Sequence, residues 1–161
     1  MDNVSVVIPC YNAAPFLSAT IESILGQTRP PGEILVIDDG STDNSAEVAA
    51  RYGSSVRVLT QPNRGESVAR NRGIDEAREE WVGFCDADDL WAPTKLEAQL
   101  ALADQETIGL ATRTLDWQDW EGGTRSVRDE PDPDDWFEFS LRVGAPFQIS
   151  SLLVRRRLSL R

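Results

Sequence analysis

Residues 34–43 read ILVIDDGSTD, a short apolar run that passes directly into two aspartates, a glycine and further small polar residues. A run that is apolar on both faces and rich in β-branched residues is typical of a buried strand in a parallel sheet. Runs of the same kind recur along the chain, at 4–8 (VSVVI), 56–59, 81–85, 108–115 and 149–154. Polar clusters follow several of these runs. Because ligands of such sheets bind at the carboxyl ends of the strands, the functional site is expected at that edge of the sheet.

Stretches with the helical spacing of apolar residues lie between these runs. They cover 12–25, 45–52, 67–77 and 95–103, and the first is predicted to have Asn12 as its N-cap. Pro9 is expected to end the strand before it, because proline has no N–H for a strand ladder. The alternation predicts an α/β fold in which layers of helices cover a mainly parallel sheet.

The composition indicates one globular domain and excludes several classes of protein. The chain has 161 residues and a formal net charge of −11, which disfavours binding to nucleic acid. It has no histidine, which excludes histidine-based catalysis and histidine-bound zinc, and its two cysteines fit a reducing compartment. We find no apolar run long enough to span a membrane and no signal peptide, so a cytoplasmic location is expected. Peripheral membrane association remains compatible with the sequence.

The composition changes after Leu115. Residues 116–138 are acidic and carry Trp117, Trp120 and Trp136 among several glycines and prolines. Two interpretations stay open: a lid that faces an acceptor, and a solvated loop whose tryptophans pack on the core. We therefore divide the single domain 1–161 into two segments, residues 1–115 and residues 116–161.

Asp86 and Asp88 follow a predicted strand, so both carboxylates lie at its tip. Alternate carboxylates can converge on a hard cation, and Mg²⁺ and Mn²⁺ prefer carboxylate, phosphate and water oxygens. Such an ion can stabilise the negative charge of a departing diphosphate. The alternative is a solvated turn that caps the next helix.

The other polar clusters also allow two interpretations each. One carboxylate of Asp38-Asp39 can accept a hydrogen bond from a nucleobase or a ribose, or the segment that follows can cap a helix. Tyr11 can cover a base with its ring or be a core aromatic at a turn. The arginines of 63–73 can contact phosphates. For Arg64 and Arg72, and for Arg78 further along, ion pairing with the many acids is preferred.

Four motifs occur in one order: VSVVIPCYN at 4–12, IDDGSTD at 37–43, NRG at 63–65 with ARNRG at 69–73, and FCDADDLW at 84–91. In this order and spacing the chain resembles the family 2 glycosyltransferases over residues 4–100, and SSLLVR at 150–155 is similar to a later strand of the family. The resemblance implies the GT-A fold, a layered α/β/α nucleotide-diphospho-sugar transferase fold. It also implies an inverting, metal-dependent hexosyltransferase of polysaccharide biosynthesis that uses a nucleotide-diphosphate sugar, with a UDP-sugar preferred.

The resemblance also implies roles for individual residues. Asp38 would hydrogen-bond the base with Asp39 adjacent, Arg70 would lie near the ribose or phosphates, and Asp88 and Asp86 would bind Mn²⁺ or Mg²⁺. The full set implied for nucleotide-sugar binding is Pro9, Tyr11, Asn12, Asp38, Asp39, Asn63, Gly65, Arg70, Asp86, Ala87 and Asp88. Residues 1–115 would bind the donor, and 116–161 would form a portion of the acceptor side, for a carbohydrate, lipid-linked or protein acceptor.

The general base is not identified from the sequence. In the family it comes from a segment downstream of the SSLLV strand, and no acid follows Arg155 here, so the chain is expected to be truncated. Three hypotheses remain: a metal-dependent glycosyltransferase, a module that binds nucleotide sugar without transfer, and a phosphoacceptor signalling domain. The last would need a lysine near the acids, and the only lysine, Lys95, falls in a predicted helix.

Overall fold

Strand β1 lies inside a six-stranded sheet in a computed structural model, which describes residues 4–103, 109–111, 117–118, 124–125 and 149–156. The strands of this sheet are β1 (Val4–Cys10), β2 (Glu33–Asp38), β3 (Arg57–Thr60), β4 (Trp81–Phe84), β5 (Gly109–Ala111) and β8 (Leu152–Arg155). A separate two-stranded sheet joins β6 (Trp117–Gln118) to β7 (Thr124–Arg125). The helices are α1 (Ala14–Leu25), α2 (Ser45–Ala50), α3 (Glu66–Glu76) and α4 (Lys95–Leu100), with 3₁₀ turns η1 (Gly53–Ser55) and η3 (Ile149–Ser151).

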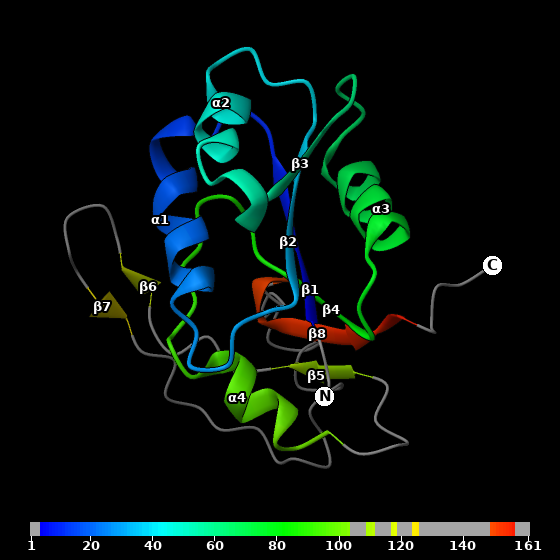
Figure 1. Ribbon diagram of the computed structural model, residues 1–161. Coiled ribbons are helices and arrows are strands. Elements are labelled where there is room, and N and C mark those ends of the chain that lie inside the picture. Colours follow the sequence, from blue (N-terminus) through cyan, green and yellow to red (C-terminus); the bar gives the residue numbers. More distant parts are fainter. Residues whose placement is uncertain (1–3, 104–108, 112–116, 119–123, 126–148, 157–161) are drawn as a thin grey trace.

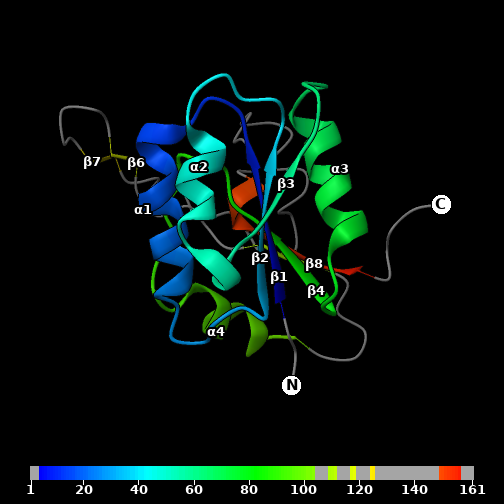
Figure 2. The same ribbon diagram turned by 45° about the horizontal axis from the view of Figure 1, so that its top comes forward.

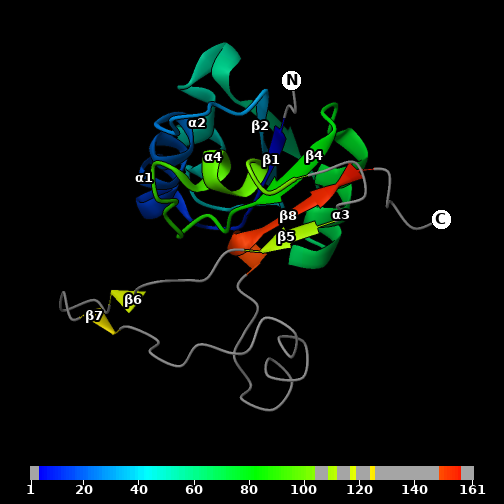
Figure 3. The same cartoon turned by 90° about the horizontal axis from the view of Figure 1, so that it is seen from below.

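The strand order is β3-β2-β1-β4-β8-β5. The pairs β1–β2, β1–β4 and β2–β3 are parallel, whereas β8 runs antiparallel to both of its neighbours, β4 and β5. Figure 3 shows β4, β8 and β5 side by side. The predicted mainly parallel sheet is therefore confirmed, with one reversed strand that comes from the far end of the sequence.

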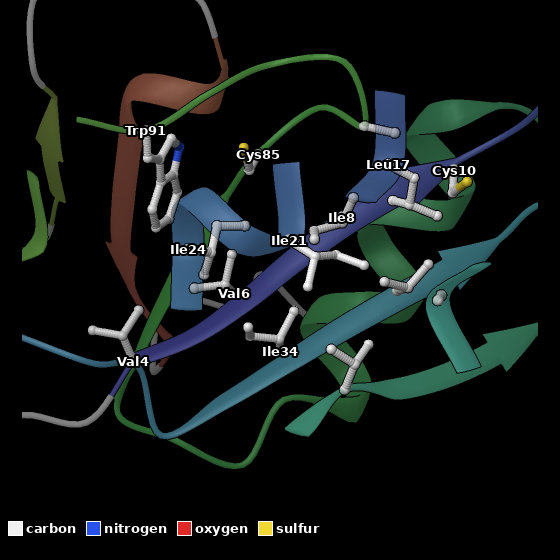
Figure 4. Packing of buried hydrophobic residues seen from close by; sticks show 14 of the residues in the cluster. Val4, Val6, Ile8, Cys10, Leu17, Ile21, Ile24, Ile34, Cys85 and Trp91 are labelled. Atoms are coloured by element: carbon white, nitrogen blue, oxygen red, sulfur yellow. The ribbon is translucent and has the colours of Figure 1, made fainter. Parts of the chain in front are cut away.

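Helices cover both faces of the sheet (Figure 1). Side chains of α1, α2 and α4 pack with Val6, Ile8 and Trp81 on one face, and α3 packs with Val7 and Phe84 on the other. Figure 4 shows residues of β1 packed beside the α1 residues on the first face. Alternate residues of β1 thus enter opposite cores, which explains why its sequence is apolar on both faces.

The prediction that Pro9 ends the first strand is wrong, because β1 continues to Cys10 and Pro9 pairs with Ile37. The carbonyl of Cys10 accepts from Asp39 N, just after β2, at 2.8 Å, and the carbonyl of Val7 accepts from Cys85 N, just after β4, at 3.1 Å. Main-chain groups of β1 therefore alternate between β2 and β4. Pro9 belongs to the β4 side, and β4 has ended at Phe84, so the missing N–H breaks no ladder.

The predicted helices are confirmed, three with shorter bounds and the one expected at 67–77 shifted by one residue to Glu66–Glu76. The expected 45–52 and 95–103 end at Ala50 and Leu100, and the expected strand 108–115 is described only over Gly109–Ala111. The expected strand 149–154 begins as the turn η3 and continues as β8. Most of 116–148 lies outside the described residues, so the division after 115 stays a prediction. Among the helices that the structure describes, none is long and apolar enough to span a bilayer.

Replacement of Gly73 by alanine is expected to destabilise the fold by about 1–3 kcal/mol. Gly73 is a buried residue of α3, and a Cβ there would lie 2.2 Å from Cγ1 of Val7, a fully buried residue of β1. Alanine would gain about 1 kcal/mol of helix propensity, but the rigid contact with a central strand outweighs it. Urea unfolding measures the difference. The matched control is Asn71→Ala at an exposed position of the same helix, which should be neutral or stabilising; equal stabilities for the two variants would contradict this prediction.

Candidate functional site

The loops that follow β1 and β2 meet at one edge of the sheet. Figure 2 shows both at the top of the molecule, and Cys10 pairs directly with Asp38 at the ends of the two strands. The side chain of Tyr11 follows this pair and is 51 % exposed. The interpretation of Tyr11 as a core aromatic is therefore wrong, and its ring is free to cover a planar ligand.

Asn12 joins the two loops instead of capping α1. It has a positive φ of 51°, and its Oδ1 accepts from Thr42 N at 2.8 Å and Asp43 N at 3.3 Å. Its own N–H donates to Ser41 Oγ at 3.0 Å. The N-cap of α1 is Ala13, so the prediction of Asn12 as N-cap is wrong. Asn12 therefore shapes this edge through the main chain of Thr42 and Asp43 and the hydroxyl of Ser41.

Asp43 takes the helix-capping role that was open for the segment after β2. Its Oδ2 accepts from Ala14 N at 3.2 Å, and its Oδ1 accepts from Ser45 N at 2.9 Å. These are the first residues of α1 and α2. The Ser45 hydroxyl contributes most to lowering the pKa of Asp43. Asp38 and Asp39 are therefore not needed to cap either helix.

Asp39 is buried and fixes the loop that leads into α3. Its Oδ1 accepts from Gln61 Nε2 at 2.7 Å and Arg64 N at 3.0 Å, and its Oδ2 accepts from Gly65 N at 2.8 Å. Burial alone would raise the pKa of Asp39, but these donors outweigh it and the net pKa is lowered. Asp39 is therefore an ionised structural carboxylate whose acceptor positions are already used.

Asp38 is equally buried but has acceptor capacity to spare. Among the described residues its carboxylate accepts one hydrogen bond, from Ser41 N at 3.3 Å. Gly40 makes the tight turn beside it with φ 74°, and a Cβ at Gly40 would lie 2.8 Å from Asn63 N. The exposed Asn63 is thereby brought next to the β2 loop. The two adjacent aspartates thus have different roles: Asp39 holds the loop before α3, and Asp38 keeps unused acceptor positions.

Arg70 of α3 connects to the acidic loop after β4. Its Nη2 donates to Asp86 Oδ1 at 2.7 Å and also pairs with Glu66. Its Nε is buried and has no hydrogen-bond partner among the described residues. Arg72, by contrast, donates to the carbonyl of Thr60 at 2.6 Å, so the preferred ion pairing with acids is wrong for it. For Arg64 and Arg78, no ion pair is found within the portion of the chain that is described.

The acids after β4 do not cap the next helix, which corrects that alternative. Helix α4 begins only at Lys95, with Thr94 at its N-cap. Asp88 is exposed, Asp86 is partly exposed and Ala87 is buried. Burial raises the pKa of Asp89, the Ser150 hydroxyl opposes this rise, and the charges of the neighbouring Asp86 and Asp88 add to it. Asp88, and Asp86 apart from the Oδ1 that Arg70 holds, are thus available to a ligand.

The donor set fits a hard cation that shares its ligands with a substrate. The described residues hold no group of three or more metal-ligating side chains, so they offer no all-protein cage. Two carboxylates, completed by phosphate oxygens and water, are a normal environment for Mg²⁺ and are also suitable for Mn²⁺. Asp86 and Asp88 are the residues that would hold such an ion.

Lys95 has the wrong surroundings for a phosphoacceptor site. Its Nζ donates to Gln99 Oε1 at 2.8 Å and lies 3.9 Å from the ring centre of Trp91. Burial lowers the pKa of Lys95 to about 8, and burial likewise raises the pKa of Cys10 and Cys85. These groups belong to the core, as expected for the cysteines. Trp120 and Trp136 lie outside the described residues, so the acceptor-lid interpretation stays open.

Sequence reasoning missed several residues that shape this edge. Gln61 and Ser45 hold Asp39 and Asp43, and hydroxyl groups of α1 and η3 hold the loop after β4. Apart from Ser150, which lies in the SSLLVR motif, each is a common polar residue without a motif, and all but Ser45 have partners that are distant in the sequence. The predicted set itself comes together only partially: Asp39 meets Gly65, and Arg70 meets Asp86, whereas Pro9 is buried in the sheet.

Comparison with known proteins identifies relatives for nearly the whole chain. The family described as Glycosyl transferase family 2 matches residues 5–160. The uncharacterized glycosyltransferase YibD of Escherichia coli (strain K12) is 44% identical over 119 residues, which cover 72% of this chain and 35% of that protein.

Two solved structures share the fold. The mannosyltransferase PcManGT from Pyrobaculum calidifontis, in complex with GDP-Man and Mn²⁺, superposes with a TM-score of 0.63 at 28% identity, covering 68% of this chain and 34% of that one. TarS 1–349 of S. aureus, in complex with UDP-GlcNAc, gives a TM-score of 0.54 at 27% identity, covering 62% and 30%. The chain thus spans about a third of the length of each of these relatives.

Proposed function

The chain belongs to glycosyl transferase family 2, and on this premise we propose that it binds a nucleotide-diphosphate sugar and transfers the sugar to an acceptor hydroxyl with inversion. The GT-A fold implied by the sequence is confirmed by the likeness to the two solved glycosyltransferases. The observation that carries the proposal is the contact of Arg70 with Asp86 beside the exposed Asp88. A guanidinium and two carboxylates at one strand tip suit a diphosphate and its cation.

We place the base of the donor beside Tyr11 and Asp38. The exposed ring of Tyr11 offers a stacking surface, and the Asp38 carboxylate has acceptor capacity left. An imide N–H, as in uracil, donates to such a carboxylate, whereas the corresponding ring position of adenine is an acceptor and would be repelled. Guanine shares the N–H of uracil, so the site selects against adenine first. A uridine donor agrees with the UDP-GlcNAc complex of TarS.

The diphosphate is placed between Arg70 and the acidic loop. A cation held by Asp86 and Asp88 would supply charge neutralisation of the departing diphosphate. The Arg70 side chain is 16 % exposed, so its guanidinium can donate to a phosphate oxygen. Pro9, Asn12, Asn63, Gly65 and Ala87 would shape this site through the backbone, with Asp39 behind them. Manganese agrees with the PcManGT complex.

Inversion requires that the acceptor hydroxyl attack the anomeric carbon on the side opposite the diphosphate. A carboxylate base must then take the proton of that hydroxyl. No described carboxylate is assigned to this step, and 116–161 remain the proposed acceptor side. A hexosyl donor and a carbohydrate, lipid-linked or protein acceptor, as in polysaccharide biosynthesis, complete the proposal.

Calorimetry with nucleoside diphosphates tests the donor site. With Mn²⁺ present, UDP should bind, GDP should bind less tightly and ADP should not bind detectably. Asp38→Asn presents an N–H group or a weaker acceptor to the base, so UDP affinity should fall about 10- to 100-fold, the value of a hydrogen bond to a charged group. Unchanged UDP affinity in this variant, or equal affinity for ADP, would contradict the placement of the base.

Release of UDP separates transfer from binding alone. Incubation of the chain with UDP-GlcNAc and simple sugar acceptors should yield free UDP and a new glycoside. Binding of the donor without any release would favour the alternative of a module that holds nucleotide sugars and lacks a general base.

A further inference from the structure

We propose that the hydroxyl groups of Thr20, Ser23 and Ser150 are positioning groups that hold the acidic loop 86–91 by its main chain and leave Asp86 and Asp88 free for a cation and a diphosphate. This inference rests on the proposed function. The three residues come from α1 and η3, two elements far apart in the sequence. We call these three hydroxyls the hydroxyl clamp.

The clamp holds the loop at its first two residues and at its last. Ser150 Oγ accepts from Asp86 N at 2.9 Å, and Thr20 Oγ1 donates to the carbonyl of Ala87 at 2.8 Å. Ser23 Oγ accepts from Trp91 N at 3.1 Å and donates to the carbonyl of Thr20 at 2.8 Å. These bonds go to backbone atoms, and the Ser150 hydroxyl also faces the carboxylate of Asp89, whose pKa is raised by burial and lowered in part by this hydroxyl. The clamp thus fixes where the loop runs and occupies no oxygen of Asp86 or Asp88.

Trp91 completes the attachment of the loop. Its Nε1 donates to the carbonyl of Ser150 at 2.9 Å, so the same residue of η3 binds both ends of the loop. The ring of Trp91 is buried in the core cluster together with Ile24 of α1, as Figure 4 shows. Within the loop, Asp89 N donates to the carbonyl of Asp86 at 3.0 Å and closes a turn. The loop is therefore fixed on a rigid region of the molecule.

Burial makes these bonds effective. Thr20 is fully buried and Ser150 is 7 % exposed, so water cannot easily replace either hydroxyl. A buried main-chain N–H or C=O that loses its partner costs about 1–3 kcal/mol, and the loop would move to recover it. Groups that orient metal ligands from behind typically change metal affinity or activity about 10- to 100-fold.

The first test compares two variants of Thr20. Thr20→Val keeps the shape and removes the hydroxyl, whereas Thr20→Ser keeps the hydroxyl and loses the methyl group. With Mn²⁺ present, UDP affinity should fall about 10-fold in Thr20→Val and Ser150→Ala and stay near wild type in Thr20→Ser. Without a metal ion, the remaining UDP affinity should change much less. If the hydroxyls had a purely structural role, the loss of UDP affinity in each variant would instead be proportional to its loss of folding stability.

Ser5→Ala is the matched control. Ser5 is fully buried in β1, and its hydroxyl likewise accepts from main-chain groups, Glu79 N at 3.1 Å and Arg78 N at 3.3 Å. These contacts lie at the start of β1, the end opposite to the site. Ser5→Ala should cost similar stability and leave Mn²⁺-dependent UDP binding intact. Equal loss of binding in Ser5→Ala and Ser150→Ala would overturn the proposal.

Hydrogen exchange separates this inference from the proposed function. The amides of Asp86 and Trp91 should exchange faster in Ser150→Ala and Ser23→Ala respectively, whereas the amides of β1 should keep their protection. If the wild type binds no UDP with Mn²⁺, the proposed function fails and the positioning role fails with it, and exchange still shows whether the clamp holds the loop. If the wild type binds and the clamp variants bind equally well, only the inference is overturned.

Discussion

Replacement of Asp88 by alanine is expected to abolish the Mn²⁺-dependent component of UDP binding, with a loss greater than about 100-fold. Removal of a residue that only orients a metal ligand typically lowers metal affinity about 10- to 100-fold, so removal of a direct ligand should lower it more. Asp88 is exposed, and the described residues give its side chain no hydrogen bond or ion pair, so the fold should lose less than about 0.5 kcal/mol. Calorimetric titration of UDP at fixed Mn²⁺, with urea unfolding alongside, measures both quantities.

Asp75→Ala is the control for this variant. Asp75 is also exposed and lies on α3, where the described residues give its side chain no hydrogen bond or ion pair. The control removes one negative charge and should leave UDP binding as it is. If Asp88→Ala retained Mn²⁺-dependent binding, or if Asp75→Ala lost it equally, the assignment of the cation to Asp86 and Asp88 would be refuted.

Replacement of Asp39 by alanine should produce the largest loss of stability among the site variants, about 1–3 kcal/mol in total. It would leave the N–H groups of Arg64 and Gly65 and the amide of Gln61 without their acceptor. These donors are only partly buried, so their combined cost is about that of one fully buried donor without a partner. The loop before α3 would detach and carry Arg70 away from Asp86, so nucleotide binding should weaken as a secondary effect. Urea unfolding at neutral pH measures the primary effect.

The same carboxylate should make stability depend on pH in the acid range. The pKa of Asp39 is lowered from its ordinary value of 3.8, so the folded state favours the ionised form. The stabilisation is then fully present above the ordinary pKa and is lost as the pH falls through the lower, folded-state pKa. The difference in unfolding free energy between wild type and Asp39→Asn should therefore shrink as the pH is lowered through this range.

Asp38→Asn serves as the comparison, because Asp38 is as buried as Asp39 but accepts one hydrogen bond from the described residues instead of several. It should affect UDP binding more than stability, and Asp39→Asn the reverse. Identical profiles for the two variants would show that the division of work between the adjacent aspartates is wrong.

The sequence was sufficient for the alternation of strands and helices, because strands buried on both faces and amphipathic helices leave clear patterns. It was misleading at Pro9. Proline is tolerated there because its missing N–H would face β4, and β4 has already ended at Phe84. It was also misleading at Asn12, whose residue type suits a cap but whose side chain bonds to residues 42 and 43. In both cases the outcome depends on a partner that is distant in the sequence.

The site was predicted as a set of residues but not as a set of contacts. The motifs pointed to Asp38, Asp39, Arg70 and Asp86. The family resemblance assigned the base to Asp38 with Asp39 adjacent, but nothing in the motifs showed that Asp39 is structural whereas Asp38 keeps unused acceptor positions. That difference arises from Gln61 and two main-chain N–H groups, which carry no sequence signal. The direction of β8 was equally hidden, since a short strand buried on both faces has no sequence feature that sets its direction.

The late position of β8 in the sequence has a consequence for biosynthesis. This strand lies between β4 and β5, and the turn before it supplies the acceptor for Asp86 N. While the ribosome is still making the preceding segment, β4 has an open edge and the acidic loop lacks one of its attachments. The nascent chain can therefore form most of the sheet early, but the acidic loop 86–91 can gain its last attachment only after residue 155 has left the exit tunnel.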